Sequence, residues 1–326
     1  MIRLLLVGNP GGTNVADSFL HAAREKGIEA ALAPSTTAFR SNRIHRTISW
    51  RVLGHRPPLL APFSQRVGND AHTIKATHVV ATGLAPVTAD VLRTIEARKI
   101  VFLTDDPWHP DFRSSWFMDA VLQYDVVYTP RRSNIDDLIN HGCRDVRYLP
   151  FGYDPRHFFR EERPAEFDVF FAGGAEDDRV RYLKPLMSDD LRVALAGDRW
   201  DRYAETRAYY KGHFDPAELR RATAAARVSI CLVRKSNRDG HVMRTFEIPA
   251  CGGCLLAEDT AEHRAIYGPH GDAVLYFNSP DELHLRVHEL LTDVNLRQKL
   301  RDAAHRIVTE GRNTYGHRLA TILQSP

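Results

Sequence analysis

Short apolar runs alternate with helix-length spacers along the whole chain, and this alternation constrains the fold more than any other feature. In the first half the runs fall at residues 3–7, 78–82, 99–103, 125–128 and 146–149. A helical pattern over 15–26 follows the first run, and Gly27 stands where a helix C-terminus favours a residue without a Cβ. Alternation of this kind predicts a parallel sheet with helices on both faces.

The second half repeats the pattern after a break that is rich in proline and polar residues. The break covers residues 150–164, and apolar runs resume at 167–172, 191–196, 228–233, 253–257 and 273–277. A chain of 326 residues exceeds the size at which one hydrophobic core usually keeps growing. We therefore expect an α/β protein with two Rossmann-like domains, at residues 1–152 and 153–310, and a C-terminal helix at 311–326.

A capping box marks one helix of the second domain. Ser279 is the expected N-cap, Pro280 the first helical residue, and Glu282 can reach back to the cap amide. We expect this helix to run over residues 280–292. Amphipathic helices without a further strand should follow it.

The composition excludes several classes of protein. The chain has 44 Lys and Arg against 41 Asp and Glu, a net charge of +3, whereas a dedicated nucleic-acid binder is strongly basic. No run approaches the roughly 18 to 20 apolar residues of a membrane span. The first strand leads directly into a glycine-rich turn rather than through a signal peptide, so we expect a cytoplasmic protein. One cluster without acidic residues is either a solvated face or a surface for an anionic acceptor: Arg40, Arg43, Arg46, Arg51 and Arg56.

The four cysteines are too few and too irregular for a disulfide framework. They are Cys143, Cys231, Cys251 and Cys254, and reduced thiols are expected. Cys251 and Cys254 have the spacing of a zinc or redox motif. No second ligand pair has comparable spacing and the motif enters an apolar strand, which favours a structural role.

Ligands of open parallel sheets bind at the carboxyl ends of the strands, so the segments after the apolar runs are the candidate site. Gly11 and Gly12 follow the first run; their loop offers amides to a phosphate or an acceptor hydroxyl, or forms a tight structural turn. It lacks both the G-x-G-x-x-G spacing and the P-loop lysine. Asp105, Asp106 and His109 follow the third run. Adjacent carboxylates can raise one pKa into the range of a general base, although Asp-Pro is also a common turn dipeptide.

The second domain has a glycine pair and many cationic residues after its strands. Gly173 and Gly174 can present amides to a diphosphate, and Arg179 can pair with its oxygens or lie on the helix surface. Trp200 follows the next strand and could stack on a base. A polar, basic loop that enters a short helix supplies phosphate neutralisation and hydroxyl acceptors: Arg234, Lys235, Asp239, Gly240, His241, Arg244 and Glu247.

With these residues in view, the chain resembles the CgeB-like (spore maturation) branch of the GT-B glycosyltransferases. The central motif is R-x-F-E-I-x-A-C-G-G at residues 244–253. Shorter pieces are Asp105-Asp106-Pro107, the segments 149–152 and 168–174 with Arg179, 281–283, and 313–315 with Arg318. The likeness spans most of the C-terminal half and is thinner before residue 100.

The resemblance implies a GT-B architecture, with the two parallel sheets facing a central cleft and the last helix returning to the N-terminal domain. It also implies a nucleoside diphosphate sugar as donor, with no cofactor and no metal. Retaining families carry two glutamates in an E-x7-E pattern, the first at the donor sugar and the second at the ribose. Glu247 matches the second, and Asp239 stands where the first would be, one methylene shorter.

The expected function is therefore sugar transfer from a nucleotide sugar, held by the second domain, to an acceptor on the first. In a retaining reaction the leaving diphosphate helps deprotonate the acceptor, and in an inverting one Asp105 or Asp106 is the base. Alternatives are a sugar-nucleotide epimerase on the same fold and a noncatalytic sugar-nucleotide-binding or coat-assembly protein. The acceptor, the retaining or inverting outcome and the oligomeric state are left open.

Overall fold

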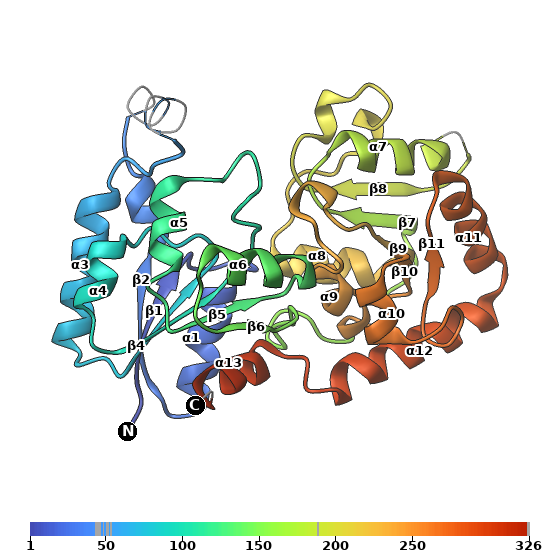
Figure 1. Ribbon diagram of the computed structural model, residues 1–326. Helices are drawn as coiled ribbons and strands as arrows, with labels where there is room; N and C mark the ends of the chain where they lie inside the picture. Colours follow the sequence, from blue (N-terminus) through green and yellow to red (C-terminus); the bar gives the residue numbers. More distant parts are fainter. Residues whose placement is uncertain (43–46, 48, 50–51, 53, 188, 325–326) are drawn as a thin grey trace. The chain divides into compact units, whose positions relative to one another are not determined.

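The computed structural model describes residues 1–42, 47, 49, 52, 54–187 and 189–324, which form two compact units (Figure 1). Unit 1 comprises Met1–Pro150, Lys235–Asp239 and Tyr315–Pro326. Unit 2 comprises Phe151–Arg234 and Gly240–Thr314. Each unit is built on one parallel sheet, which confirms the expected α/β fold with two Rossmann-like parts.

Unit 1 holds a six-stranded sheet in the order β2-β1-β3-β4-β5-β6. Every neighbouring pair is parallel. The strands are β1 (Arg3–Gly8), β2 (Glu29–Pro34), β3 (His78–Thr82), β4 (Arg98–Phe102), β5 (Val126–Thr129) and β6 (Val146–Tyr148). The helices are α1 (Val15–Glu25), α3 (Leu60–Thr73), α4 (Ala89–Thr94), α5 (Ser115–Val121), α6 (Ile135–His141) and α13 (Tyr315–Gln324).

Helix α1 ends as its sequence predicts. Gly27 has a φ of +68°, and the amide of Ile28 bonds to the carbonyl of Ala23 at 2.9 Å. This is the Schellman arrangement, in which a residue without a Cβ adopts the left-handed conformation at low cost.

The C-terminal helix α13 packs on α1 inside unit 1 (Figure 1). The ring of Tyr315 meets the ring of Phe19 edge-on, with centroids 5.9 Å apart. Arg318 donates from Nε to the carbonyl of Pro150 at 2.9 Å. These contacts bury an apolar face of a helix that could not hold its structure alone at this length.

Unit 2 holds a five-stranded parallel sheet in the order β11-β10-β9-β7-β8. The strands are β7 (Phe167–Ala172), β8 (Val193–Ala196), β9 (Ala226–Cys231), β10 (Leu255–Glu258) and β11 (Leu275–Phe277). The helices are α7 (Asp177–Leu183), α8 (Pro216–Ala224), α9 (Arg244–Ala250), α10 (Ala261–Tyr267), α11 (Pro280–Thr292) and α12 (Val294–Glu310).

Helix α11 begins at its predicted cap, with one difference. Ser279 Oγ accepts from the amide of Glu282 at 3.1 Å, and Pro280 is the first helical residue. The carboxylate of Glu282 accepts instead from the amide of Asn278, at 3.0 Å. The prediction that it reaches the cap amide is therefore wrong by one residue, because the backbone before the cap turns the Asn278 amide toward it.

Both sheets reverse their strand order at one point. In unit 1 the chain adds strands to one side of β1 and then to the other, so the reversal lies between β1 and β3. In unit 2 it lies between β7 and β9. Such switch points leave a crevice at the carboxyl ends of the two strands, where open α/β sheets bind their ligands.

Among the helices of the described residues, none has both the length and the apolar character needed to cross a membrane. All four cysteines are buried free thiols. Burial raises the pKa of both Cys251 and Cys254 to about 12, so they stay protonated. Buried, protonated thiols fit the structural role expected for this pair.

Candidate functional site

The switch point of unit 2 carries the glycine pair that follows β7. The amide of Gly173 bonds to the carbonyl of Ala196 at 2.9 Å, which ties it to the end of β8. Gly197, after β8, has a φ of +120°, and a Cβ there would lie 2.4 Å from the carbonyl oxygen of Gly173. Two backbone segments thus approach each other as only glycine allows.

Trp200 supports this turn from inside unit 2. Its side chain is fully buried, its Nε1 donates to the carbonyl of Gly173 at 2.7 Å, and its ring meets Phe171 edge-on at 5.6 Å. The suggestion that this indole stacks on a base is therefore wrong: the ring fills the core and its one donor is used.

Arginines gather next to the same glycine pair. Arg179 is 8% exposed and donates from Nη1 to the carbonyl of Gly174 at 3.0 Å. Its buried Nε has no hydrogen-bond partner among the described residues. Arg234, which follows β9, donates from Nε to Glu176 at 2.8 Å, and Arg179 lies 3.8 Å from the same carboxylate oxygen.

Helix α9 adds a buried ion pair. Glu247 is 2% exposed and pairs with Arg244 one turn earlier in the helix. Burial raises the pKa of the Cys231 thiol, at the end of β9, to about 12, and both Arg179 and Arg244 act on it electrostatically in the opposite direction. Glu258 acts on it in the same direction as burial, so charges of both signs act on this strand end.

Gly240 and His241 lie in the loop that leads to α9. His241 is fully buried; its Nδ1 pairs with Glu262 at 2.5 Å and its Nε2 accepts from the amide of Phe151 at 3.1 Å. A Cβ on Gly240 would lie 2.5 Å from the Glu262 side chain. Both residues therefore hold the loop in shape, and a direct contact with donor stays a prediction.

In unit 1 the strand ends carry a network of paired charges. Asp106, after β4, is 1% exposed. One carboxylate oxygen accepts from the amide of Trp108 at 2.9 Å and from Asn134 at 3.1 Å. Both oxygens accept from Arg238, at 2.5 and 3.0 Å. Asp106 therefore serves as a structural anchor for the turn, whichever further role it has.

Residues 235–239, which include Lys235, pack within unit 1 although they come late in the chain. Asp239 pairs with the buried Arg131 at 2.5 Å, and Arg131 also donates to the carbonyl of Thr104 at 2.7 Å. Burial raises the pKa of Asp239 to about 6, while Arg131 opposes that shift. Asn237 accepts from the amide of Asp106 at 2.8 Å. The acidic residue expected at the donor sugar thus belongs to the network of unit 1.

Two other predicted residues lie at the edge of this network. Asp105 is half-buried and accepts from the Thr104 hydroxyl at 3.1 Å. His109 is buried, stacks on Phe112 at 4.8 Å and accepts at Nδ1 from the amide of Asp111 at 3.1 Å. That bond leaves the proton on Nε2, which has no hydrogen-bond partner among the described residues.

Gly11 and Gly12 form an exposed loop after β1. Both have a positive φ, +68° and +61°. The Gly11 amide bonds to Asp17 at 3.0 Å, and Asn14 donates to the Gly11 carbonyl at 2.8 Å. The loop is thus a structural turn in its own right, and contact with an acceptor stays a prediction.

Several residues of these clusters were not anticipated from the sequence. Arg131 and Asn134 follow β5, so the rule that pointed to Asp105 also applied to them. Glu176 and Glu262 also follow strands, β7 and β10, but nothing in the sequence indicated their partners, which are distant in the chain. Within the arginine cluster, Arg43, Arg46 and Arg51 lie outside the described residues, and Arg40 and Arg56 are exposed.

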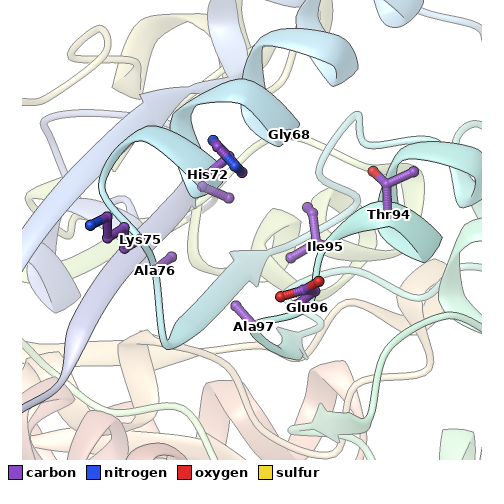
Figure 2. A pocket seen from close by; sticks show the side chains of 9 residues that line it. Gly68, His72, Lys75, Ala76, Thr94, Ile95, Glu96 and Ala97 are labelled. Carbon is purple, nitrogen blue, oxygen red and sulfur yellow. The ribbon is translucent and has the colours of Figure 1, made fainter.

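Two cavities in unit 1 lie apart from the charge network and the glycine loop. One of about 370 Å³ lies between α3 and the segment before β4 (Figure 2) and is lined by residues such as His72, Lys75 and Glu96. It opens near the amino ends of β3 and β4, the edge opposite to the predicted site. The other, of about 310 Å³, is lined by residues such as Thr88 and Trp116. Arg56 of the arginine cluster lines the second cavity, and none of the other predicted site residues lines either one.

Comparison with known proteins adds independent information. Residues 179–324 match the family described as Glycosyl transferase-like. No curated protein has a significantly similar sequence. Sucrose-phosphate synthase from Thermosynechococcus elongatus superposes with a TM-score of 0.69 at 12% identity, over 99% of this chain and 98% of that one.

Two further solved structures are similar over nearly their whole length. HepE of Anabaena in complex with UDP-glucose gives a TM-score of 0.66 at 14% identity, over 100% of both chains. BGT of phage T4 in complex with its UDP-glucose substrate gives 0.60 at 11%, over 98% of both. The fold is therefore that of GT-B glycosyltransferases. Together with the family match, it confirms the expected class, a glycosyltransferase of GT-B fold.

Proposed function

We propose that this protein transfers a sugar from a nucleoside diphosphate sugar to an acceptor, with the donor bound at the switch point of unit 2. One observation carries the proposal. The strand ends at β7 and β9 bring a glycine turn and arginines together where open α/β sheets bind ligands. We further infer that the chain belongs to the CgeB-like branch that its central motif resembles.

The diphosphate is the part of the donor that these groups suit best. Arg179 has a buried guanidinium nitrogen without a partner among the described residues, and an anionic oxygen would satisfy it. Glu176 already draws Arg234 and Arg179 toward one carboxylate. A diphosphate offers oxygens of the same kind and more charge, so we expect both arginines to bind the diphosphate in place of Glu176. Arg244 and the backbone amide of Gly174 complete the proposed phosphate site, while the Gly173 amide is already bonded to the carbonyl of Ala196.

In this proposal Glu247 binds the ribose. Its carboxylate is buried one turn into α9 and is oriented by Arg244. A carboxylate can accept from two vicinal hydroxyls, which a ribose provides. We propose a uridine nucleotide, because HepE and T4 BGT were both solved with UDP-glucose.

Unit 1 supplies the acceptor side in this proposal, with Gly11, Gly12 and His109 as candidate contacts. If the reaction inverts, Asp105 is a better base than Asp106. Asp105 is half-buried and bonded to one hydroxyl, whereas both oxygens of Asp106 are held by Arg238. If the reaction retains configuration, the leaving phosphate takes the acceptor proton, and Asp239 acts on the donor sugar.

Binding and turnover over a panel of nucleotide sugars test this function. Glu247→Ala should weaken binding of the preferred donor by about 1.5 to 3 kcal/mol, roughly 10- to 150-fold, because a charged hydrogen bond is lost from a buried site. Glu310→Ala, an exposed glutamate on α12, is the matched control and should bind like the wild type. Calorimetry measures both affinities, and circular dichroism confirms that both variants fold.

The same panel separates the alternative functions. An isomerised donor without an acceptor would identify an epimerase, and tight binding without turnover would identify a noncatalytic binder. Unchanged donor affinity in folded Glu247→Ala would remove this residue from the donor site. We also propose that transfer needs no metal, because arginines can neutralise the diphosphate. Activity lost on chelation and restored by Mg²⁺ or Mn²⁺ would contradict that part.

A further inference from the structure

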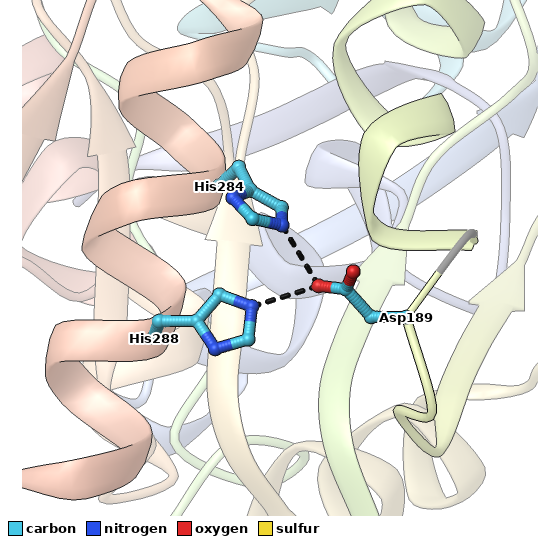
Figure 3. A group of neighbouring side chains, drawn as sticks. All are labelled: Asp189, His284 and His288. Carbon is cyan, nitrogen blue, oxygen red and sulfur yellow. Dashed lines mark hydrogen bonds and ion pairs between the residues drawn. The ribbon is translucent and has the colours of Figure 1, made fainter.

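Two histidines on α11 and one aspartate converge on a single point at the surface of unit 2. His284 and His288 are one turn apart, so their rings leave the same face of the helix (Figure 3). Their Nε2 atoms lie 2.8 and 2.7 Å from the same carboxylate oxygen of Asp189. The ring centroids are 4.6 Å apart. Asp189 precedes β8, and His284 follows it 95 residues later in the chain.

We propose that Asp189, His284 and His288 form a binding site for a divalent transition-metal ion, with Zn²⁺ as the best match. Two imidazole nitrogens and one carboxylate oxygen are a ligand set that zinc accepts, with a water in the fourth position. Two imidazoles disfavour Mg²⁺ and Ca²⁺, which prefer oxygen ligands alone.

The geometry can accommodate the ion with little movement. Ligand atoms at about 2.0 to 2.2 Å from a tetrahedral zinc are about 3.3 to 3.5 Å from one another. The two Nε2 atoms lie 2.8 and 2.7 Å from the carboxylate oxygen, and the three candidate atoms all lie within 4.8 Å of one another, so movements of up to about 1 Å by each side chain are enough. The side chains of His284, His288 and Asp189 are 37, 43 and 27% exposed, which leaves them free to adjust and gives the ion a path from solvent.

The site is positioned to hold unit 2 together. It joins the segment before β8 to the middle of α11, and 95 positions of sequence separate Asp189 from His284. The proposed donor groups follow the carboxyl ends of β7 and β9, whereas Asp189 stands before the amino end of β8. A metal here therefore stabilises unit 2 without taking part in sugar transfer, and the inference does not depend on the proposed function.

Calorimetric titration of ZnCl₂ into the full chain tests the site. The protein is purified without a polyhistidine tag and stripped with a chelator that is then removed. We expect one Zn²⁺ per chain and a higher melting temperature when zinc is added. His284→Ala/His288→Ala should remove binding. Asp189→Asn keeps the shape of the side chain but removes its charge, and it should weaken zinc binding at least tenfold. Loss of a side chain that only hydrogen-bonds a metal ligand already lowers metal affinity about 10- to 100-fold.

A single exposed histidine–aspartate pair provides the control. His213 lies 3.5 Å from Asp198 in the same unit but belongs to no group of three candidate metal ligands among the described residues, so His213→Ala should bind zinc like the wild type. The proposal is overturned if the stripped chain binds no stoichiometric zinc. It is equally overturned if folded His284→Ala/His288→Ala binds one ion with wild-type affinity. Melting curves without zinc establish that the variants fold.

Discussion

The two units share a topology but differ in the charge at their strand ends. In each sheet the third strand joins the first on the side opposite the second, which creates a switch point at β1 and β3 or at β7 and β9. In unit 1 the nearby acidic groups are paired internally: Asp106 with Arg238 and Asp239 with Arg131. In unit 2 Arg179 and Arg234 approach one carboxylate of Glu176, and Arg244 pairs with Glu247.

Under the proposed function, this difference gives the same scaffold two roles. Charges that satisfy each other in a buried network contribute to a defined conformation and have little capacity left for a ligand. Arginines beside a glycine turn can bind an anion. The three predictions below test this contrast, and they run from the largest expected effect to the smallest.

Arg131→Ala should destabilise the protein by about 3 to 5 kcal/mol, because it leaves the buried Asp239 carboxylate without its cation. Arg132→Ala is the matched control. Arg132 is exposed and rests on the Tyr148 ring at 4.1 Å, so its loss should cost at most about 1 kcal/mol. Urea unfolding measures both.

Equal losses of stability in Arg131→Ala and Arg132→Ala would contradict the importance of the buried charge network in unit 1. A double variant sharpens the test: Arg131→Met/Asp239→Leu replaces the buried pair with apolar side chains and should recover much of the loss. If the double variant is as unstable as Arg131→Ala, the stability that Arg131 supplies comes from its hydrogen bond to the Thr104 carbonyl rather than from the ion pair.

Arg179→Ala should weaken donor binding by about 1.5 to 3 kcal/mol through loss of a charged hydrogen bond to phosphate. Arg181→Ala, two residues along α7, is the control. Arg181 is exposed and lies 5.6 Å from the Tyr182 ring, so its removal should leave the affinity unchanged. Calorimetry measures the donor affinities of both variants. Equal affinities would show that Arg179 is not part of a phosphate site.

Gly11→Ala should cost about 1 kcal/mol of stability, because its φ of +68° strains any residue with a Cβ. Gly27→Ala should cost a similar amount. Both glycines have φ values of +68° and no described atom within 4 Å of a built Cβ. The pair separates the two interpretations of the loop. A contact loop predicts that only Gly11→Ala slows sugar transfer, and a purely structural turn predicts equal rates.

Most of the fold could be predicted because its strands are apolar runs of ordinary length. The strand β2 was missed: its sequence, Glu29–Pro34, is rich in alanine, has low β-propensity and pairs only with β1 at the edge of the sheet. The strands predicted at 191–196 and 228–233 correspond to β8 and β9 but differ from the observed bounds by two residues, as expected where flanking residues share the same apolar character.

The site was predictable only in part, for a related reason. The rule that ligands bind after strand ends requires only the order of elements, so it found Gly173, Arg179 and Arg234 without any knowledge of contacts. It could not find the partners of these residues. Glu176 beside Arg234 and Glu262 beside His241 depend on how loops fold back, which local sequence does not encode.

Periodicity and turn chemistry are local properties, and they determined the α/β class, the capped helices and the candidate segments at the strand ends. Tertiary structure alone decided which charges meet. It joined Asp239 to Arg131 across 108 residues and Asp189 to His288 across 99. The physical reason is that pairing of buried charges is set by packing between segments remote in the chain. Spacing along the sequence carries no record of that packing.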